Sequence, residues 1–126
     1  KLPSGRVYCF PDAKWTDWGS ATNRTAICNY PVQGFATADL LPIALVHLDK
    51  VIRKNKMQSV ICNTVHDSIV LDVHPDEKEQ CIELLSKSML SISDGSKARY
   101  GLEYDMPIGI ELKIGKNWLD LNEVNY

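Results

Sequence analysis

The strongest apolar pattern in the chain is helical. Apolar residues spaced at i, i+4, i+7 and i+11 predict one long helix over Tyr30 to Lys56. Pro42 lies inside this segment, where a proline removes one hydrogen bond and clashes with the carbonyl group four residues earlier. The sequence therefore predicts either a helix start near Pro42 or a kink there, and we favour the kink. The stripe consists of Leu41, Leu45, Leu48 and Ile52, and Ala38, Ala44 and Val51 widen it.

A second pattern is typical of strands. Two runs rich in Val, Ile and Thr within residues 59–73 predict a hairpin of two buried strands. Alternation of apolar with polar or small residues from Met106 to Ile114 predicts a strand with one buried face, and Pro107 marks its start or an edge. Residues 2–11 predict a turn and a short strand closed by a proline. Trp118 and Leu119 are expected to fold back as an anchor.

A shorter helix is expected after the hairpin. Pro75 suits the first helical position, and the helix should end near Leu90. Residues 14–23 and 91–100 show no apolar period and predict loops. The order of strand, helix, hairpin, helix and strand predicts one α+β domain over residues 1–126, a small antiparallel sheet with helices packed on one face. The predicted buried face of the shorter helix consists of Cys81, Leu84, Leu85 and Ser88. Glu83 and Lys87 of the same helix are spaced to form an i, i+4 ion pair.

Composition narrows the class of protein. Hydrophobic content of 44% and charged content of 24% are ordinary for a globular protein, and the net charge of -2 does not suggest tight nucleic-acid binding by the chain alone. The longest apolar run, Leu40 to Leu48, is too short to span a bilayer, and no signal peptide is visible. The four cysteines are scattered, which favours core thiols over zinc or disulfides. We therefore expect a cytoplasmic protein with no membrane partner.

The turn of the hairpin holds His66, Asp67 and Ser68, and no glycine. Tight hairpin turns need positive φ, which His and Asp adopt at a higher cost than glycine. When a turn lacks its preferred residues inside a segment that otherwise fits its predicted structure, the exception points to function. An aspartate in a turn more often satisfies its own backbone; the other interpretation is a rigidly mounted carboxylate that holds a metal ion.

Four stretches, in order, resemble family A DNA polymerases, the group of bacterial DNA polymerase I and many phage enzymes. Gly5-Arg6 lies in a segment similar to the Gly-Arg strand of that family, and residues 29–34 are similar to its Asn-x-Pro-x-Gln-Gly helix start. Residues 65–68 resemble the Val-His-Asp-Glu turn. Residues 115–118 resemble the Gly-x-x-Trp near the end of those chains, and residues 30–35 lean toward phage-type members.

The resemblance implies the C-terminal part of a polymerase palm. Family members transfer nucleotides with two Mg²⁺ ions held by two aspartates, and Asp67 matches the second of these. The first aspartate and the fingers helix would precede Lys1, so the chain is expected to be inactive alone. It would work with the N-terminal remainder of a DNA-directed DNA polymerase, from the same gene or a separate chain. Its partners would be primer-template DNA and dNTP, in a bacterial or phage-infected cell.

The resemblance also implies contacts with DNA. The family's matching Asn and Gln read the minor groove of the primer-template, which assigns that role to Asn29 and Gln33. His66 matches a histidine beside the primer terminus, and Arg24 and Arg6 are possible further contacts, although Arg24 is one position off the family's arginine. Without the resemblance, the sequence would favour simpler interpretations. Asn29 would be an N-cap, Gln33 a solvated residue of the first helical turn and His66 an ordinary turn residue.

Two departures from the family pattern stand out. Ser68 replaces the Glu that often follows the turn aspartate, which removes a second carboxylate. The segment from Gly34 to Asp39 is one residue longer than in bacterial members, which predicts a helix bulge just before Pro42. The alternative to an enzyme fragment is a non-catalytic, polymerase-derived module for DNA binding or assembly.

Overall fold

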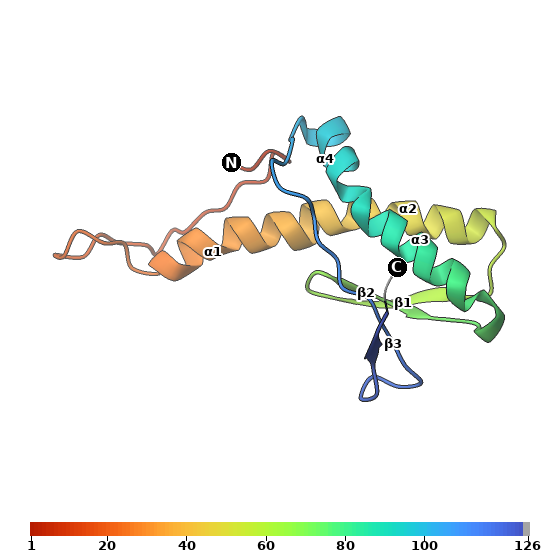
Figure 1. Ribbon diagram of the computed structural model, residues 1–126. Coiled ribbons are helices and arrows are strands. Elements are labelled where there is room, and N and C mark those ends of the chain that lie inside the picture. Colours follow the sequence, from red (N-terminus) through yellow and green to blue (C-terminus); the bar gives the residue numbers. More distant parts are fainter. Residues whose placement is uncertain (125–126) are drawn as a thin grey trace.

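A long helical rod runs across the molecule (Figure 1). The computed structural model describes residues 1–124, and the rod consists of α1 (Arg24–Gly34), the π-helical segment η1 (Phe35–Leu40) and α2 (Leu41–Lys54). The helix therefore begins at Arg24, earlier than the predicted Tyr30, and α1 continues through Pro31. The predicted loop before it, residues 14–23, is confirmed as a loop with one isolated bridge.

The regular hydrogen bonding of the rod changes at η1. The backbone N–H of Leu41 donates to the carbonyl oxygen of Ala36, five residues back, and this confirms the bulge predicted before Pro42. A π-helical turn absorbs one extra residue, so the helix after it keeps its orientation. For this reason Leu41, Leu48 and Ile52 are buried as predicted. Ala38, which lies within the wide turn, is exposed, contrary to the prediction.

Two further helices pack on α2 and form the core. η2 (Pro75–Glu77) leads into α3 (Lys78–Leu90), which ends at the predicted residue and carries the predicted Glu83–Lys87 ion pair. Buried serines are common here, and Ser88 lies 2.9 Å from the His47 ring. The buried apolar side chains are Leu41, Ala44, Leu48, Ile52, Cys81, Ile92 and Leu112.

The loop predicted over residues 91–100 is wrong, because this segment forms α4 (Ile92–Tyr100). Ile92 and Ser96 are buried, and α4 packs closely on α2: a Cβ atom at Gly95 would lie 2.4 Å from Cγ2 of Ile43. α4 shows little amphipathic pattern, because serine and glycine occupy the positions that face its neighbour. Close approach of the helices, rather than a stripe of large apolar residues, holds it in place.

The predicted hairpin is present, but its strands are not buried as predicted. β1 (Val60–Val65) and β2 (Ser68–Asp72) pair antiparallel, with a bulge between Ile61 and Asn63. The side chains of Val60 and Val65 are exposed, and so is Cys62 at the bulge. Prediction of core thiols is therefore right only for Cys81, because Cys9, Cys28 and Cys62 are exposed free thiols.

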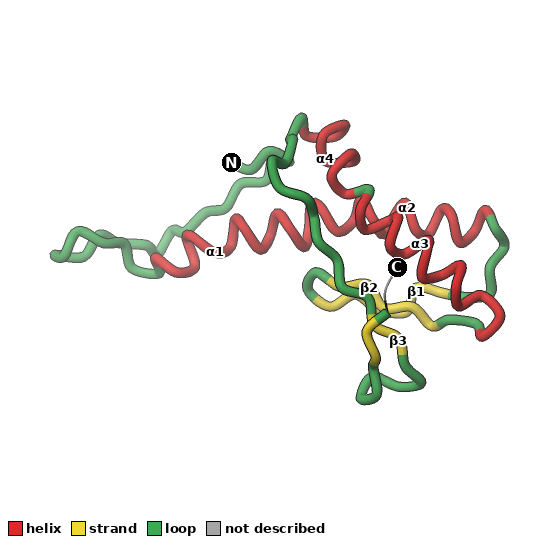
Figure 2. Tube along the Cα trace, in the orientation of Figure 1, coloured by secondary structure: helices red, strands yellow, loops and turns green. Residues whose placement is uncertain are grey.

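The sheets are smaller than predicted, although the α+β class is confirmed. β3 (Lys113–Ile114) and β4 (Asn122–Glu123) form a second two-stranded sheet separate from the hairpin, so the single sheet is wrong. Residues 101–112 run as a loop from α4 past the hairpin (Figure 2), and the short strand expected within residues 2–11 is also loop. Trp118 and Leu119 are 63% and 91% exposed, so the expected anchor is wrong.

The molecule exposes more surface than its size requires. Its accessible surface is 9343 Å², whereas a compact monomer of this size exposes about 6,800 Å². Large apolar side chains contribute to the surplus. The most exposed of them are Trp15, Trp18, Val32, Met106 and Leu119. Burial of such side chains by a neighbouring segment would be favourable.

Candidate functional site

The hairpin turn presents a histidine and an aspartate on a rigid support. Val65 pairs with Ser68, so the loop consists of His66 and Asp67 alone. The φ angle of His66 is +54°, which confirms the expected positive φ, and this conformation costs a non-glycine residue about 1 kcal/mol. Ser68, which stands where the family often has Glu, donates its hydroxyl to the carbonyl of Val65 at 2.8 Å. The two loop side chains are exposed.

The base of the hairpin is fastened to the start of α3. The carboxylate of Glu77 accepts hydrogen bonds from the Ser59 hydroxyl at 2.6 Å and from the backbone N–H groups of Gln58 and Ser59. The hydrogen bond from Ser59 is the main cause that lowers the pKa of Glu77 below its ordinary value. The Ser59 hydroxyl also accepts from the N–H of His74 at 3.0 Å. Sequence reasoning missed this role of Glu77.

Asn29 and Gln33 both lie in α1, four residues apart, and so share one face of the helix. The N-cap of α1 is Asn23, so the interpretation of Asn29 as an N-cap is wrong. Gln33 belongs to the last turn of α1 rather than the first, and its side chain is exposed.

One hollow of about 260 Å³ brings three of the predicted residues together. It lies between the end of α1, the start of η1 and the hairpin turn, so that Gln33 faces the same space as His66 and Asp67. Asn29 does not line it. Thr37, which sequence reasoning missed, donates its hydroxyl to the Gln33 carbonyl at 2.8 Å; its i+4 spacing from Gln33 was the available signal. The lining residues are Val32, Gln33, Ala36, Thr37, His66 and Asp67.

The two arginines named as possible DNA contacts differ in their surroundings. Arg6 donates from Nη2 to the carboxylate of Asp39 at 2.9 Å, so its guanidinium group is held within the molecule. Arg24 is the first residue of α1 and is exposed. Neither lines the hollow.

Asp67 is the single carboxylate in the hollow. Within residues 1–124, no group of three or more His, Cys, Asp or Glu side chains is placed to hold a metal ion. The described part of the chain therefore places one carboxylate in this hollow and no complete set of metal ligands.

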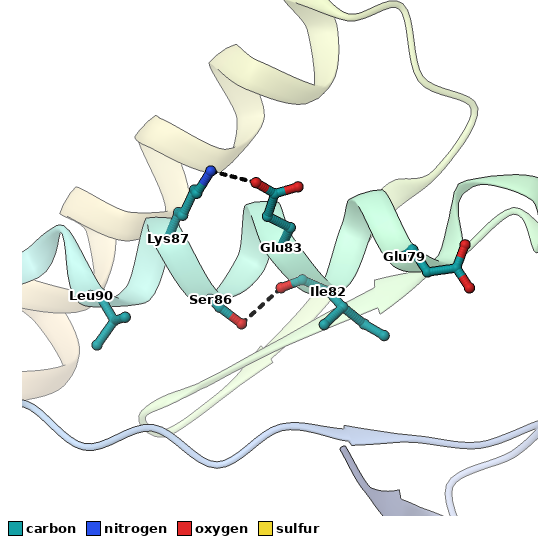
Figure 3. A pocket seen from close by; sticks show the side chains of 6 residues that line it. All are labelled: Glu79, Ile82, Glu83, Ser86, Lys87 and Leu90. Carbon is teal, nitrogen blue, oxygen red and sulfur yellow. Dashed lines mark hydrogen bonds and ion pairs between the residues drawn. The ribbon is translucent and has the colours of Figure 1, made fainter. Parts of the chain in front are cut away.

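A second hollow, of about 280 Å³, lies along α3 (Figure 3). All of its lining residues come from this one helix, from Glu79 to Leu90. Three of its polar side chains are already paired, because Lys87 bonds Glu83 and the Ser86 hydroxyl bonds the carbonyl of Ile82. It brings no separate segments together, unlike the hollow at the turn.

Comparison with known proteins identifies the family. The model of DNA polymerase family A matches residues 3–120. The chain therefore belongs to DNA polymerase family A.

Three relatives illustrate the match. The chain is 35% identical to DNA polymerase I of Lactococcus lactis subsp. cremoris over 97 residues, 77% of the chain and 10% of that protein. It is 32% identical to the DNA polymerase of Bacillus phage SP01 over 125 residues, 98% of the chain and 13% of the relative. It is 31% identical to DNA polymerase I of Aquifex aeolicus over 99 residues, which are 79% of the chain and 16% of that protein.

The chain spans between a tenth and a sixth of the length of these relatives. No solved structure matches it. Among the described residues, none of the helices has the length and apolar character needed to cross a membrane.

Proposed function

We propose that this chain is part of the palm of a template-directed DNA polymerase, where it supplies one metal-binding carboxylate and part of the grip on the primer-template. The observation that carries the proposal is the hollow shared by Gln33, His66 and Asp67. These residues come from two elements far apart in the sequence, and each lies in a stretch that resembles a motif of the family. Their convergence on one space supports a common task.

Asp67 would be one ligand of the Mg²⁺ ions. When bound, Mg²⁺ would supply charge neutralisation at the phosphoryl group that is transferred. Because the described residues offer no second carboxylate in the hollow, the remaining ligands must come from the remainder of the polymerase. The companion could be part of the same polypeptide or a separate chain, and the surplus of exposed apolar surface supports its presence.

Asn29 and Gln33 would donate their amide N–H groups to the acceptors of the minor groove, which every base pair presents. His66 would lie beside the primer terminus, and the exposed Arg24 is free of the internal ion pair that holds Arg6. Because the net charge of this chain is -2, we expect other parts of the enzyme to supply most contacts with the DNA phosphates.

Primer extension with Mg²⁺ tests this function in the complete polymerase that contains this chain. Asp67→Asn should lower the rate at least about 100-fold, because loss of a metal ligand exceeds the usual effect of its supporting groups. Asp72→Asn is the matched control, since Asp72 is an exposed aspartate on the same hairpin, paired with Val60. It should leave the rate unchanged.

Two results would overturn the proposal. Equal activity of the wild type and Asp67→Asn would favour a non-catalytic module for assembly or DNA binding. Template-dependent extension by the 126-residue chain alone would show that no outside carboxylate is needed.

A further inference from the structure

The π-helical segment η1 is held by residues that do not line the hollow. Asp39, in η1, is buried at 8% exposure. Its carboxylate accepts from the Ser4 hydroxyl at 2.7 Å and from Arg6 Nη2 at 2.9 Å, with a longer bond from Nε at 3.3 Å. The extended N-terminal segment is thus tied to the middle of the rod.

Other contacts reach the same segment. The hydroxyl of Tyr100, at the end of α4, donates to the backbone carbonyl of Asp39 at 3.3 Å, and its ring lies 5.8 Å from that of Phe35. Tyr8 occupies the space beside Gly34 so closely that a Cβ atom there would lie 1.7 Å from its hydroxyl. We call Ser4, Arg6, Tyr8 and Tyr100 the clamp.

The clamp and the hollow use different faces of the same turns. Val32, Gln33, Ala36 and Thr37 line the hollow, whereas the clamp holds Gly34, Phe35 and Asp39. π-helical turns are rare and occur frequently at functional sites. A buried carboxylate is also costly unless it is fully hydrogen-bonded, as Asp39 is here. Stability alone would be served as well by an apolar residue at this position.

We propose that Asp39 is a positioning residue, which locks η1 through Ser4, Arg6 and Tyr100 and so holds the helical wall with Gln33 and Thr37 over the His66–Asp67 turn. This inference rests on the proposed function. Asp39 touches neither metal nor DNA. Its effect should therefore fall on binding of the primer-template, and the rate of the chemical step should change less.

The test compares Asp39→Asn with Asp49→Asn in the complete polymerase. Asp49 forms an i, i+4 ion pair with Arg53 at 2.8 Å on the same rod, but the pair is exposed and far from the hollow in sequence. Asp39→Asn should raise the KM for primer-template roughly tenfold, the effect of one lost charge-assisted hydrogen bond. The kcat and the KM for dNTP should stay within about threefold, and Asp49→Asn should change none of these.

Hydrogen exchange provides a second, activity-independent measurement. In Asp39→Asn, the backbone amides of residues 36–41 should exchange faster, while those of α3 keep their protection. Arg6→Lys, which keeps the charge but loses the paired donors, should give an intermediate change in both exchange and KM. Ser4→Ala, a milder variant, keeps the test valid where Asp39→Asn folds poorly.

Three outcomes would overturn the inference. Unchanged exchange and unchanged KM would show that the clamp does not govern the hollow. A parallel loss of kcat and of folded protein, restored at lower temperature, would reduce Asp39 to a structural role. An effect of Asp49→Asn equal to that of Asp39→Asn would remove the specificity. The failure of the proposed function is separate, because it appears as normal extension by Asp67→Asn.

Discussion

The π-helical segment makes a sharp prediction about single-residue deletions. In the structure, the N–H of Leu41 donates to the carbonyl of Ala36, five residues back. Deletion of the exposed Ala38 makes Ala36 the fourth residue before Leu41, so the same pair of atoms becomes an ordinary α-helical hydrogen bond. The apolar stripe of α2 then keeps its orientation, and the chain should retain its fold.

Deletion of Val46 provides the matched comparison, because it is an exposed apolar residue inside the regular helix α2. Without a wide turn to absorb the change, the helix after it rotates by about 100° relative to the part before it. Leu48 and Ile52, which are 0% and 8% exposed, would leave the core. Burial of each such side chain contributes about 1.5–3 kcal/mol, so the deletion should cost about 3–6 kcal/mol. This is a large fraction of the roughly 5–15 kcal/mol expected for a domain.

Thermal unfolding followed by circular dichroism measures both deletions. Deletion of Ala38 should shift the midpoint by no more than a few degrees, whereas deletion of Val46 should lower it by at least about 10 °C or abolish the transition. Equal losses for the two variants would show that η1 is not an absorbed insertion. So would a greater loss for the Ala38 deletion.

Three further predictions concern the core, the clamp and the thiols. Leu48→Ala, at a fully buried position, should lower the free energy of unfolding by about 3–5 kcal/mol in urea titrations, and a loss under 1 kcal/mol would contradict the core described here. The hydrogen bond from Arg6 holds the pKa of Asp39 below its ordinary value, so its stabilising effect is fully present above about pH 4 and is lost as the pH falls toward the folded-state pKa. Asp39→Asn should therefore weaken the acid dependence of the urea midpoint below pH 4, and an unchanged slope would refute the assignment. Cys81 is buried while the other thiols are exposed, so a thiol reagent should modify Cys62 rapidly and Cys81 only on unfolding; equal rates would contradict this.

Local sequence signals predicted the elements that their own residues decide. The stripe from Leu41 to Ile52 indicated α2, and Pro75 indicated the start of the next helix. The runs of β-branched residues around His66 indicated the hairpin. The π-helical turn was indicated instead by the family resemblance, because the segment before Pro42 is one residue longer than in bacterial members. For the helices and the hairpin, the pattern and the local backbone preference point to the same structure.

The site was predictable only in part. The motif resemblance led to Gln33, His66 and Asp67, and the structure places them around one hollow. Nothing in the sequence indicates that Asp39 would be buried against Arg6, because the two residues are 33 positions apart and neither belongs to a periodic pattern. The same holds for the bonds between Glu77 and Ser59, 18 positions apart. Tertiary hydrogen bonds of this kind leave no local signal.

The wrong burial predictions for Val60, Val65 and Met106 share one physical cause. An apolar pattern indicates that a side chain is buried in the complete protein, but it does not indicate which segment covers it. Val60 and Val65 lie in runs typical of buried strands, and Met106 begins an alternating run. These three side chains are exposed here, whereas Leu112 of the same alternating run is buried. The relatives are between six and ten times longer than the region they share with this chain. Other parts of such a protein are therefore available to cover these side chains. Under the proposed function, we infer that the exposed Val60, Val65 and Met106 side chains are buried against other parts of the complete polymerase. In the proposed enzyme, a segment that packs on the exposed hairpin would also be placed to bring a second carboxylate toward Asp67, which lies at the turn of that hairpin.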